Sequence, residues 1–126
     1  MDNTRQSETT KKDEFNKKVQ ENDSSIARSK EAIKKINEFE GDLRDLNKEF
    51  DKYLELLNSA VKGHKVNAMI NESSFEKNHS LNKTLVDLNK RRQIITDKLK
   101  KDMNHREELL DEYNKELEND SKKDDN

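Results

Sequence analysis

The three histidines, His64, His79 and His105, are the side chains best suited to binding a metal or moving a proton. A zinc-binding helix places two histidines three or four residues apart, so that both lie on one face. Successive histidines in this sequence are 15 and 26 residues apart. We therefore expect solvated surface histidines, and neither a metal site nor a cofactor.

The 28 acidic side chains are the other candidates for catalysis, and 26 lysines and arginines are interleaved with them. Opposite charges four residues apart on a helix stabilise each other, which explains this interleaving without a catalytic role. General acid–base catalysis needs carboxyl groups whose pKa values are shifted inside a pocket, and a pair of helices offers no such pocket. The sequence also lacks a glycine-rich phosphate loop, so we predict that the protein is not an enzyme.

Lys90-Arg91-Arg92 is the one compact basic run of the sequence. A nucleic-acid interface needs such a run within a wider basic face. Asp87 and Asp97 flank the run instead, and the net charge of the chain is −2. The pattern favours a solvated helix face, and we predict no binding of nucleic acid.

The composition is typical of long helices rather than of a compact globule. The chain has 126 residues, of which 43% are charged and 28% are hydrophobic, and it has no proline. Ordinary globular domains are roughly 45–50% apolar. Proline breaks helices, so its absence permits long ones, but low hydrophobicity with high charge is also typical of disorder. Hydrophobic periodicity decides between these two alternatives.

The first residues of the chain lack the apolar stretch of a cleaved signal peptide, and no window approaches the ~18 apolar residues of a transmembrane helix. The absence of cysteine suits a reducing compartment. We expect a cytoplasmic protein that does not insert into membranes, and export by a route that needs no signal peptide stays open.

A first helix is predicted over residues 12–62, after a disordered tail at residues 1–11. From residue 36 onward, apolar residues recur in alternating steps of three and four, the pattern of a coiled-coil seam. These seam residues are Ile36, Phe39, Leu43, Leu46, Phe50, Tyr53, Leu57 and Ala60. Upstream, polar residues occupy the seam positions and apolar residues shift to the neighbouring flank. The polar residues are Asn22, Ser25 and Ser29, and the shifted apolar residues are Val19, Ile26 and Ile33.

A loop is predicted over residues 63–73. Gly63 stands where a left-handed C-cap would end the first helix, and Ser73 and Glu76 fit a capping box that would start the second. The loop region is unusually apolar, and two roles for it are open: it caps the end of the hairpin, or it docks on a partner. Its apolar residues are Val66, Met69, Ile70 and Phe75.

A second helix is predicted over residues 74–118, followed by a disordered tail at residues 119–126. Its apolar residues recur mostly in steps of three, four or seven, with a stutter from Ile95 to Met103. Arg92 and Arg106 fall at seam positions where apolar residues are expected. The apolar residues are Leu81, Leu85, Leu88, Ile95, Leu99, Met103, Leu110, Tyr113 and Leu117. The sequence therefore predicts one all-α domain, an antiparallel, coiled-coil-like two-helix hairpin with disordered termini.

A two-helix hairpin buries one stripe of each helix, so a further helical protein would supply the missing burial. We therefore predict binding to helical proteins, and a self-assembling structural coiled coil stays an alternative. A prefoldin-like holdase would need β-hairpins between the helices, and the eleven residues 62–72 are too few. The predicted hairpin and partner interface consists of Ile36, Phe39, Leu43, Leu46, Phe50, Tyr53, Leu57, Leu85, Leu88, Ile95, Leu99, Met103, Leu110 and Tyr113.

This architecture resembles the small helical-hairpin accessory and targeting proteins of Gram-positive type VII secretion that are encoded beside LXG-domain toxins. The likeness covers residues 15–118 and extends in shape to the small WXG-motif proteins. The chain departs from that motif because it has no tryptophan, and Leu117 stands four residues after Tyr113 where an export signal has an acidic residue. The resemblance implies a chaperone-like adaptor that binds the helical N-terminal domain of a secreted toxin, with a second small helical protein.

Overall fold

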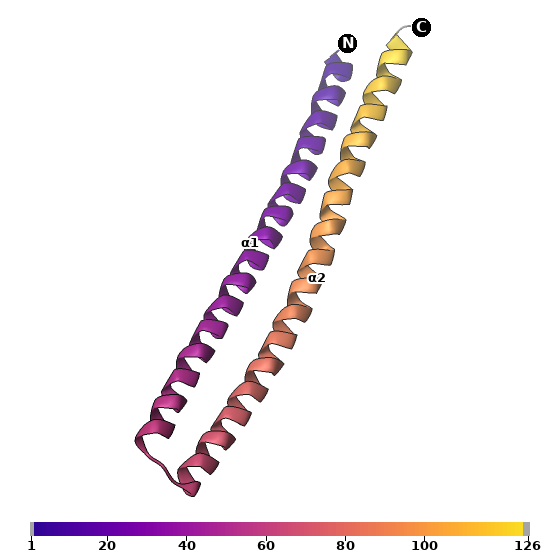
Figure 1. Cartoon of the computed structure of the whole chain (residues 1–126). Coiled ribbons are helices and arrows are strands. Elements are labelled where there is room, and N and C mark those ends of the chain that lie inside the picture. Colours follow the sequence, from indigo (N-terminus) through magenta and orange to yellow (C-terminus); the bar gives the residue numbers. More distant parts are fainter. Residues whose placement is uncertain (1, 125–126) are drawn as a thin grey trace. The chain divides into compact units, whose positions relative to one another are not determined.

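The computed structural model describes the backbone of residues 2–124 and the side chains of residues 10–120. Two α-helices make up the described chain: α1 spans Asp2–Ala60 and α2 spans His64–Asp124 (Figure 1). The predicted all-α hairpin is confirmed, and no strand occurs within residues 2–124. Residues 61–63 connect the two helices in the chain.

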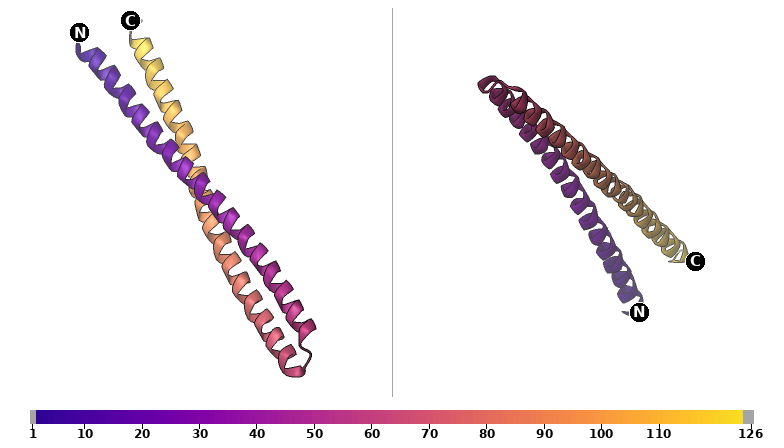
Figure 2. Two further views of the ribbon diagram at one scale, coloured as in Figure 1. Left: turned by 90° about the vertical axis from the view of Figure 1, so that its left-hand side faces the viewer. Right: turned by 90° about the horizontal axis from the view of Figure 1, so that it is seen from below.

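Both helices extend further than the periodicity indicates. α1 begins at Asp2 and α2 ends at Asp124, inside the segments predicted as disordered tails, while residues 1, 125 and 126 lie outside the described residues. Lysine, glutamate, glutamine and arginine favour helix without any hydrophobic pattern, and no proline stops either helix. α1 also runs unbroken through Gly41. The two further views show α1 as one continuous helix (Figure 2).

The predicted loop over residues 63–73 is corrected, because α2 already begins at His64. No described glycine has a positive φ, so the left-handed C-cap predicted at Gly63 is wrong. The Gly63 carbonyl instead accepts a hydrogen bond from the Asn67 amide at 3.0 Å, which is the first turn of α2. Gly63 therefore serves as the N-cap of α2, a position that glycine tolerates well. Ser73, predicted as an N-cap, lies inside α2.

The chain divides into two compact units, and each contains one segment of each helix. Unit 1 comprises residues 1–32 and 95–126, and unit 2 comprises residues 33–94. Within each unit the two segments run antiparallel and face each other along one row per helix. We call this facing row the seam of the unit, and the two units are described in turn.

In unit 1 the seam mixes apolar and polar residues. Asn22 and Ser29 are 7% and 5% exposed, and Leu109 on α2 is 7% exposed. The prediction that Asn22 and Ser29 occupy seam positions is confirmed. Val19 and Ile26, predicted on the neighbouring flank, lie in this seam instead, because they alternate with Asn22 and Ser29 in steps of three and four. The half-buried apolar residues of the seam are Phe15, Val19, Ile26, Ile95, Leu99 and Tyr113.

In unit 2 every second seam position of α1 lies one residue further along than predicted. Phe39, Leu46 and Tyr53, expected in the seam, are 49%, 62% and 59% exposed. The residue that follows each of them faces α2 instead: these residues are Glu40, Asn47 and Leu54. Polar contacts explain the choice, because Glu40 and Asn47 both bind cationic side chains of α2. The remaining seam positions are shared by both registers and are Ile36, Leu43, Phe50 and Leu57.

Candidate partner-binding surface

Phe39, Leu46 and Tyr53 form an exposed apolar row on α1 of unit 2. They are spaced seven residues apart, so they lie on one line along the helix beside the seam. We call these three residues the flank row. About half or more of each side chain is exposed to water, an unusual arrangement for residues that follow so regular a pattern.

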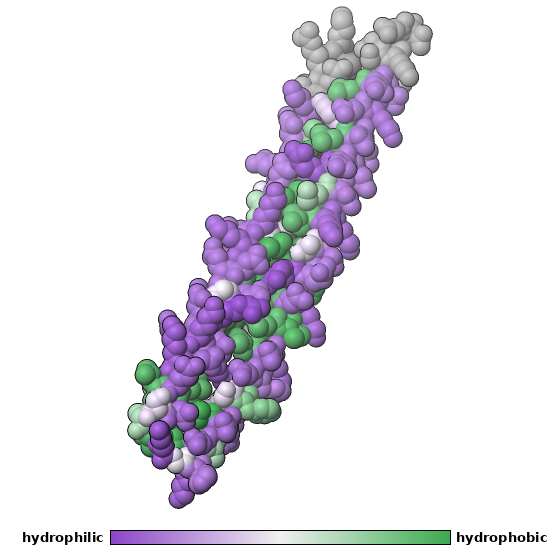
Figure 3. Space-filling model, viewed as in Figure 1, coloured by the Kyte–Doolittle hydropathy of each residue, from purple (hydrophilic) through white to green (hydrophobic). Residues whose placement is uncertain are grey.

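The flank row continues the apolar surface of the seam. The rings of Phe50 and Tyr53 lie 6.3 Å apart between centroids and are tilted by 42°. Leu46 lines a groove of about 160 Å³ together with Leu43, Phe50 and Leu81. Figure 3 shows hydrophobic surface exposed on the visible face of the hairpin near the turn. A helix laid along the flank row would therefore also cover seam side chains that are only partly buried.

The other flank of the same α1 segment is polar. Its residues follow the seam positions shared by both registers and are all exposed: they are Asn37, Arg44, Asp51 and Asn58. A two-stranded coiled coil needs only a narrow apolar stripe, whereas a helix of a bundle carries a stripe at least one row wider. The α1 segment of unit 2 has the wider stripe on one side only.

Glu40 and Arg92 form an ion pair across the seam of unit 2. Arg44 on the same helix also binds the Glu40 carboxylate, at 3.1 Å from its Nη2 to Oε1. Hydrogen bonds from Arg44 and Arg92, in that order of size, hold the pKa of Glu40 below its ordinary value of 4.5. The ionised carboxylate therefore joins the two helices of the unit, and Arg92 occupies the seam position predicted for it.

Lys77 supplies the second polar contact of this seam. Its Nζ donates to Asn47 Oδ1 at 2.8 Å and pairs with the Asp51 carboxylate. The same Nζ lies 5.5 Å from the centroid of the Phe50 ring, and the side chain is only 15% exposed. Polar contacts of this kind fix the register of paired helices, because any shift along the seam leaves their members unpaired.

The apolar residues near the turn differ in how far they are buried. Val66 and Ile70 are half-buried and line a groove of about 220 Å³ with Leu54, Leu57 and Met69, so they cap the end of unit 2. Met69 and Phe75 are 66% and 72% exposed. Phe75 contacts only the ring of His79 among the described aromatic rings, at 6.1 Å between centroids.

Polar residues of the two helices also contact each other in unit 1. Asn22 Nδ2 donates to the Asp102 backbone carbonyl at 2.9 Å, and Ser25 Oγ donates to the Asp102 carboxylate at 2.7 Å. Arg106, predicted at a seam position, pairs with Asp23 at 2.8 Å and remains 45% exposed. Asn22 and Ser25 therefore find hydrogen-bond partners on α2 within the unit.

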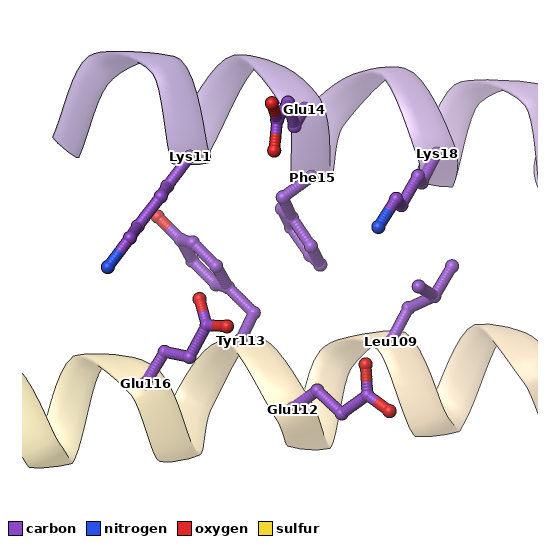
Figure 4. Close-up of a pocket in the computed structure, with 8 residues that line it drawn as sticks. All are labelled: Lys11, Glu14, Phe15, Lys18, Leu109, Glu112, Tyr113 and Glu116. Atoms are coloured by element: carbon purple, nitrogen blue, oxygen red, sulfur yellow. The ribbon is translucent and has the colours of Figure 1, made fainter. Parts of the chain in front are cut away.

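The rings of Phe15 on α1 and Tyr113 on α2 stack between the two helices of unit 1 (Figure 4). Their ring centroids are 4.1 Å apart and the rings are nearly parallel, at 11°. Lysines and glutamates surround the pair: Lys11, Lys18, Glu14, Glu112 and Glu116 line the same groove. Two stacked rings ringed by side chains of both charges are typical of a contact between two helices rather than of a ligand site.

The structure brings nine of the fourteen predicted interface residues into the seams and leaves five outside. Ile36, Leu43, Leu85, Leu88, Ile95, Leu99 and Tyr113 are half-buried or buried, whereas Phe50 and Leu57 lie at seam positions with 40% and 36% exposure. Outside the seams are Phe39, Leu46 and Tyr53 in unit 2, and Met103 and Leu110 in unit 1. The sequence reasoning missed Glu40, Asn47, Lys77 and Asp102, whose only signal was a seven-residue spacing from apolar seam residues.

The three histidines are exposed, whereas Arg92 of the basic run lies in the seam of unit 2. Within the described residues, no three His, Asp or Glu side chains could together hold a metal ion. In the basic run, Arg91 pairs with Asp87 at 3.0 Å and Arg92 pairs with Glu40, so both arginines are engaged by acids of the chain itself. Along residues 2–124, neither helix carries an apolar stretch long enough to cross a membrane.

The flank row is thus the strongest candidate for a binding surface among the described side chains. No protein-family model, curated protein or solved structure matches this chain.

Proposed function

We propose that this protein is a non-catalytic adaptor that binds a helical segment of another protein along the flank row. The observation that carries the proposal is the exposure of Phe39, Leu46 and Tyr53 at strict heptad spacing, beside a seam that does not use them. Two helices that bind each other do so through apolar side chains on successive turns, and the flank row has such side chains.

The energetics favour a third helix at this place. Full burial of one large apolar side chain contributes about 1.5–3 kcal/mol, so covering the exposed half of three such residues contributes roughly 3–4 kcal/mol. Neighbouring seam residues Phe50 and Leu57, 40% and 36% exposed, would lose further apolar surface to water in the same complex. This gain belongs to the complex, because the hairpin alone has no described element that covers the row.

More specifically, we propose that the partner is the helical N-terminal domain of an LXG-domain toxin of type VII secretion, with a second small helical protein in the complex. Support for this comes from the likeness in architecture, a helical hairpin of this length without proline or cysteine. The exposed row adds a surface through which such an adaptor would lie along its cargo.

The test is co-expression with the helical domain of an LXG toxin encoded beside the protein's gene, followed by affinity purification. Leu46→Asp should abolish co-purification, because it places a charge in the centre of the flank row. Lys48→Ala is the matched control, since Lys48 is also exposed but lies off the row. Leu46→Asp should leave the helicity of the free protein unchanged, which separates lost binding from lost folding.

Equal effects of Leu46→Asp and Lys48→Ala on co-purification would overturn the flank row as the binding surface. A stable homo-oligomer that Leu46→Asp dissociates would instead assign the protein to self-assembly. The absence of any LXG toxin gene beside its own gene would remove the secretion part of the proposal and leave the helix-binding part standing.

A further inference from the structure

Two acidic residues interleave with the flank row. Phe39, Asp42, Leu46, Glu49 and Tyr53 follow one another in steps of three, four, three and four, so the five residues share one face of α1. Asp42 and Glu49 are exposed. Neither has a cation within 4.0 Å among the side chains of residues 10–120, whereas Glu40 and Asp51 nearby are both paired.

A helix that docks on the flank row brings its own flanking side chains next to these two carboxylates. Charges at the flanks of a helix–helix contact select partner and orientation, because opposite charges attract and like charges across the contact repel. Docking also removes water around Asp42 and Glu49, which makes an approaching acidic flank more costly than it would be in open solvent.

We propose that the partner segment is an amphipathic helix whose apolar residues recur at heptad spacing and whose flank facing Asp42 and Glu49 carries lysine or arginine. This inference rests on the proposed function, since it names the chemistry of the helix that occupies the flank row. It assigns Asp42 and Glu49 to partner selection and Leu46 to anchoring.

A second copy of this chain fits the row less well than a basic helix. If two copies met antiparallel through the same row, each would bring its own Asp42 and Glu49 to the contact, so the acids of the two copies would face one another. The observations therefore favour a different chain as the occupant, and self-association is an outcome that the experiment below detects.

The probes are two synthetic helical peptides of about four heptads, with leucine at both apolar positions of each heptad and either lysine or glutamate at the flanking positions. Binding of each labelled peptide to the full-length protein is measured by fluorescence anisotropy. The lysine-flanked peptide should bind at least about tenfold more tightly than the glutamate-flanked one. The difference should shrink as ionic strength rises from ~0.05 M to ~0.5 M, because salt screens exposed charges.

Two variants make the test specific. The double variant Asp42→Lys with Glu49→Lys should reverse the preference, so that the glutamate-flanked peptide binds better. Glu21→Lys with Glu31→Lys is the matched control, because it changes the net charge by the same amount at exposed α1 positions of unit 1. This control should keep the preference for lysine, and Leu46→Asp should abolish binding of both peptides.

Each outcome decides something. Equal binding of both peptides that Leu46→Asp abolishes would overturn the basic-partner inference and keep the flank row as a helix-docking surface. Binding that both charge-reversal pairs weaken alike would overturn the inference as well, since it reports only net charge. Binding unaffected by Leu46→Asp would overturn the docking surface itself. Sedimentation showing a dimer that Leu46→Asp dissociates would give the row to a second copy.

Discussion

Unit 1 and unit 2 are built from the same two helices but differ in which residues of α1 they bury. Unit 1 has polar residues in its seam, Asn22 and Ser29, and Asn22 is hydrogen-bonded to α2 within the hairpin. Unit 2 has more apolar residues than its seam can cover, and the flank row stays exposed. The comparison shows that a seam can take a polar residue where it finds a partner, whereas apolar residues beside a seam stay exposed to water.

Unit 1 also has exposed apolar residues, but they lie on the other helix. Met103, Leu110 and Leu117 of α2 are 49%, 37% and 50% exposed and are spaced seven residues apart. One acidic residue, Glu107, alternates with them, whereas the next such position is the uncharged Asn114. No groove reaches the row among the described pockets of unit 1. They form a second, less developed row.

The largest effect that separates seam from flank row is expected at Leu88. This residue is 8% exposed in the seam of unit 2, so Leu88→Ala should lower the free energy of unfolding by about 2 kcal/mol through lost burial and the cavity left behind. Leu46→Ala removes the same atoms from a side chain that is 62% exposed and should cost under about 0.7 kcal/mol. Urea denaturation followed by circular dichroism measures both, and equal costs would erase the distinction.

A smaller effect is expected at Asn22 in unit 1. Asn22→Ala should destabilise the protein by about 1–2 kcal/mol, because it removes the part-buried hydrogen bond to the Asp102 carbonyl. Asn22→Leu should instead raise the melting temperature and weaken register specificity, which sedimentation would detect as new oligomers. A melting temperature that Asn22→Leu lowers would show that unit 1 needs the polar contact for stability itself.

The smallest effect is a pH dependence from Glu40 in unit 2. Its pKa is lowered in the folded state, so its contribution to stability is present above the unfolded value of 4.5 and is lost as the pH falls through the lower folded value. The melting temperature of the wild type should therefore drop more steeply below pH 4.5 than that of Glu40→Gln. Parallel curves for the two proteins would contradict a contribution of the Glu40–Arg92 pair to folding.

Much of the fold is predictable from the sequence because helix formation is a local property. The heptad spacing and the lack of proline predict both helices, and the seam positions of Asn22, Ser29 and Arg92 are read correctly from spacing alone. The length of the turn is not predictable in this way, because the helical conformation of Val66 and Ile70 depends on their packing with Leu54 and Leu57 on the other helix.

The seam register of unit 2 is hidden in the sequence for a physical reason. On α1, either of two rows can alternate with the seam row that contains Leu43 in steps of three and four. One is the apolar flank row, and the other consists of Glu40, Asn47 and Leu54. Hydrophobicity alone predicts the flank row in the seam. The structure has the row of Glu40 there instead, because Glu40 pairs with Arg92 and Asn47 accepts a hydrogen bond from Lys77. Only the pairing of two distant segments reveals that choice.

The central claim is that Leu54 holds the hairpin together while Leu46 faces outward for a partner. The most direct measurement is the thermal melting of Leu46→Asp and Leu54→Asp, followed by circular dichroism. Because Leu54 is 8% exposed and Leu46 is 62% exposed, Leu54→Asp should lose much of its helicity and Leu46→Asp should melt like the wild type. Retained melting in Leu54→Asp together with collapse in Leu46→Asp would place the flank row in the seam and contradict the account.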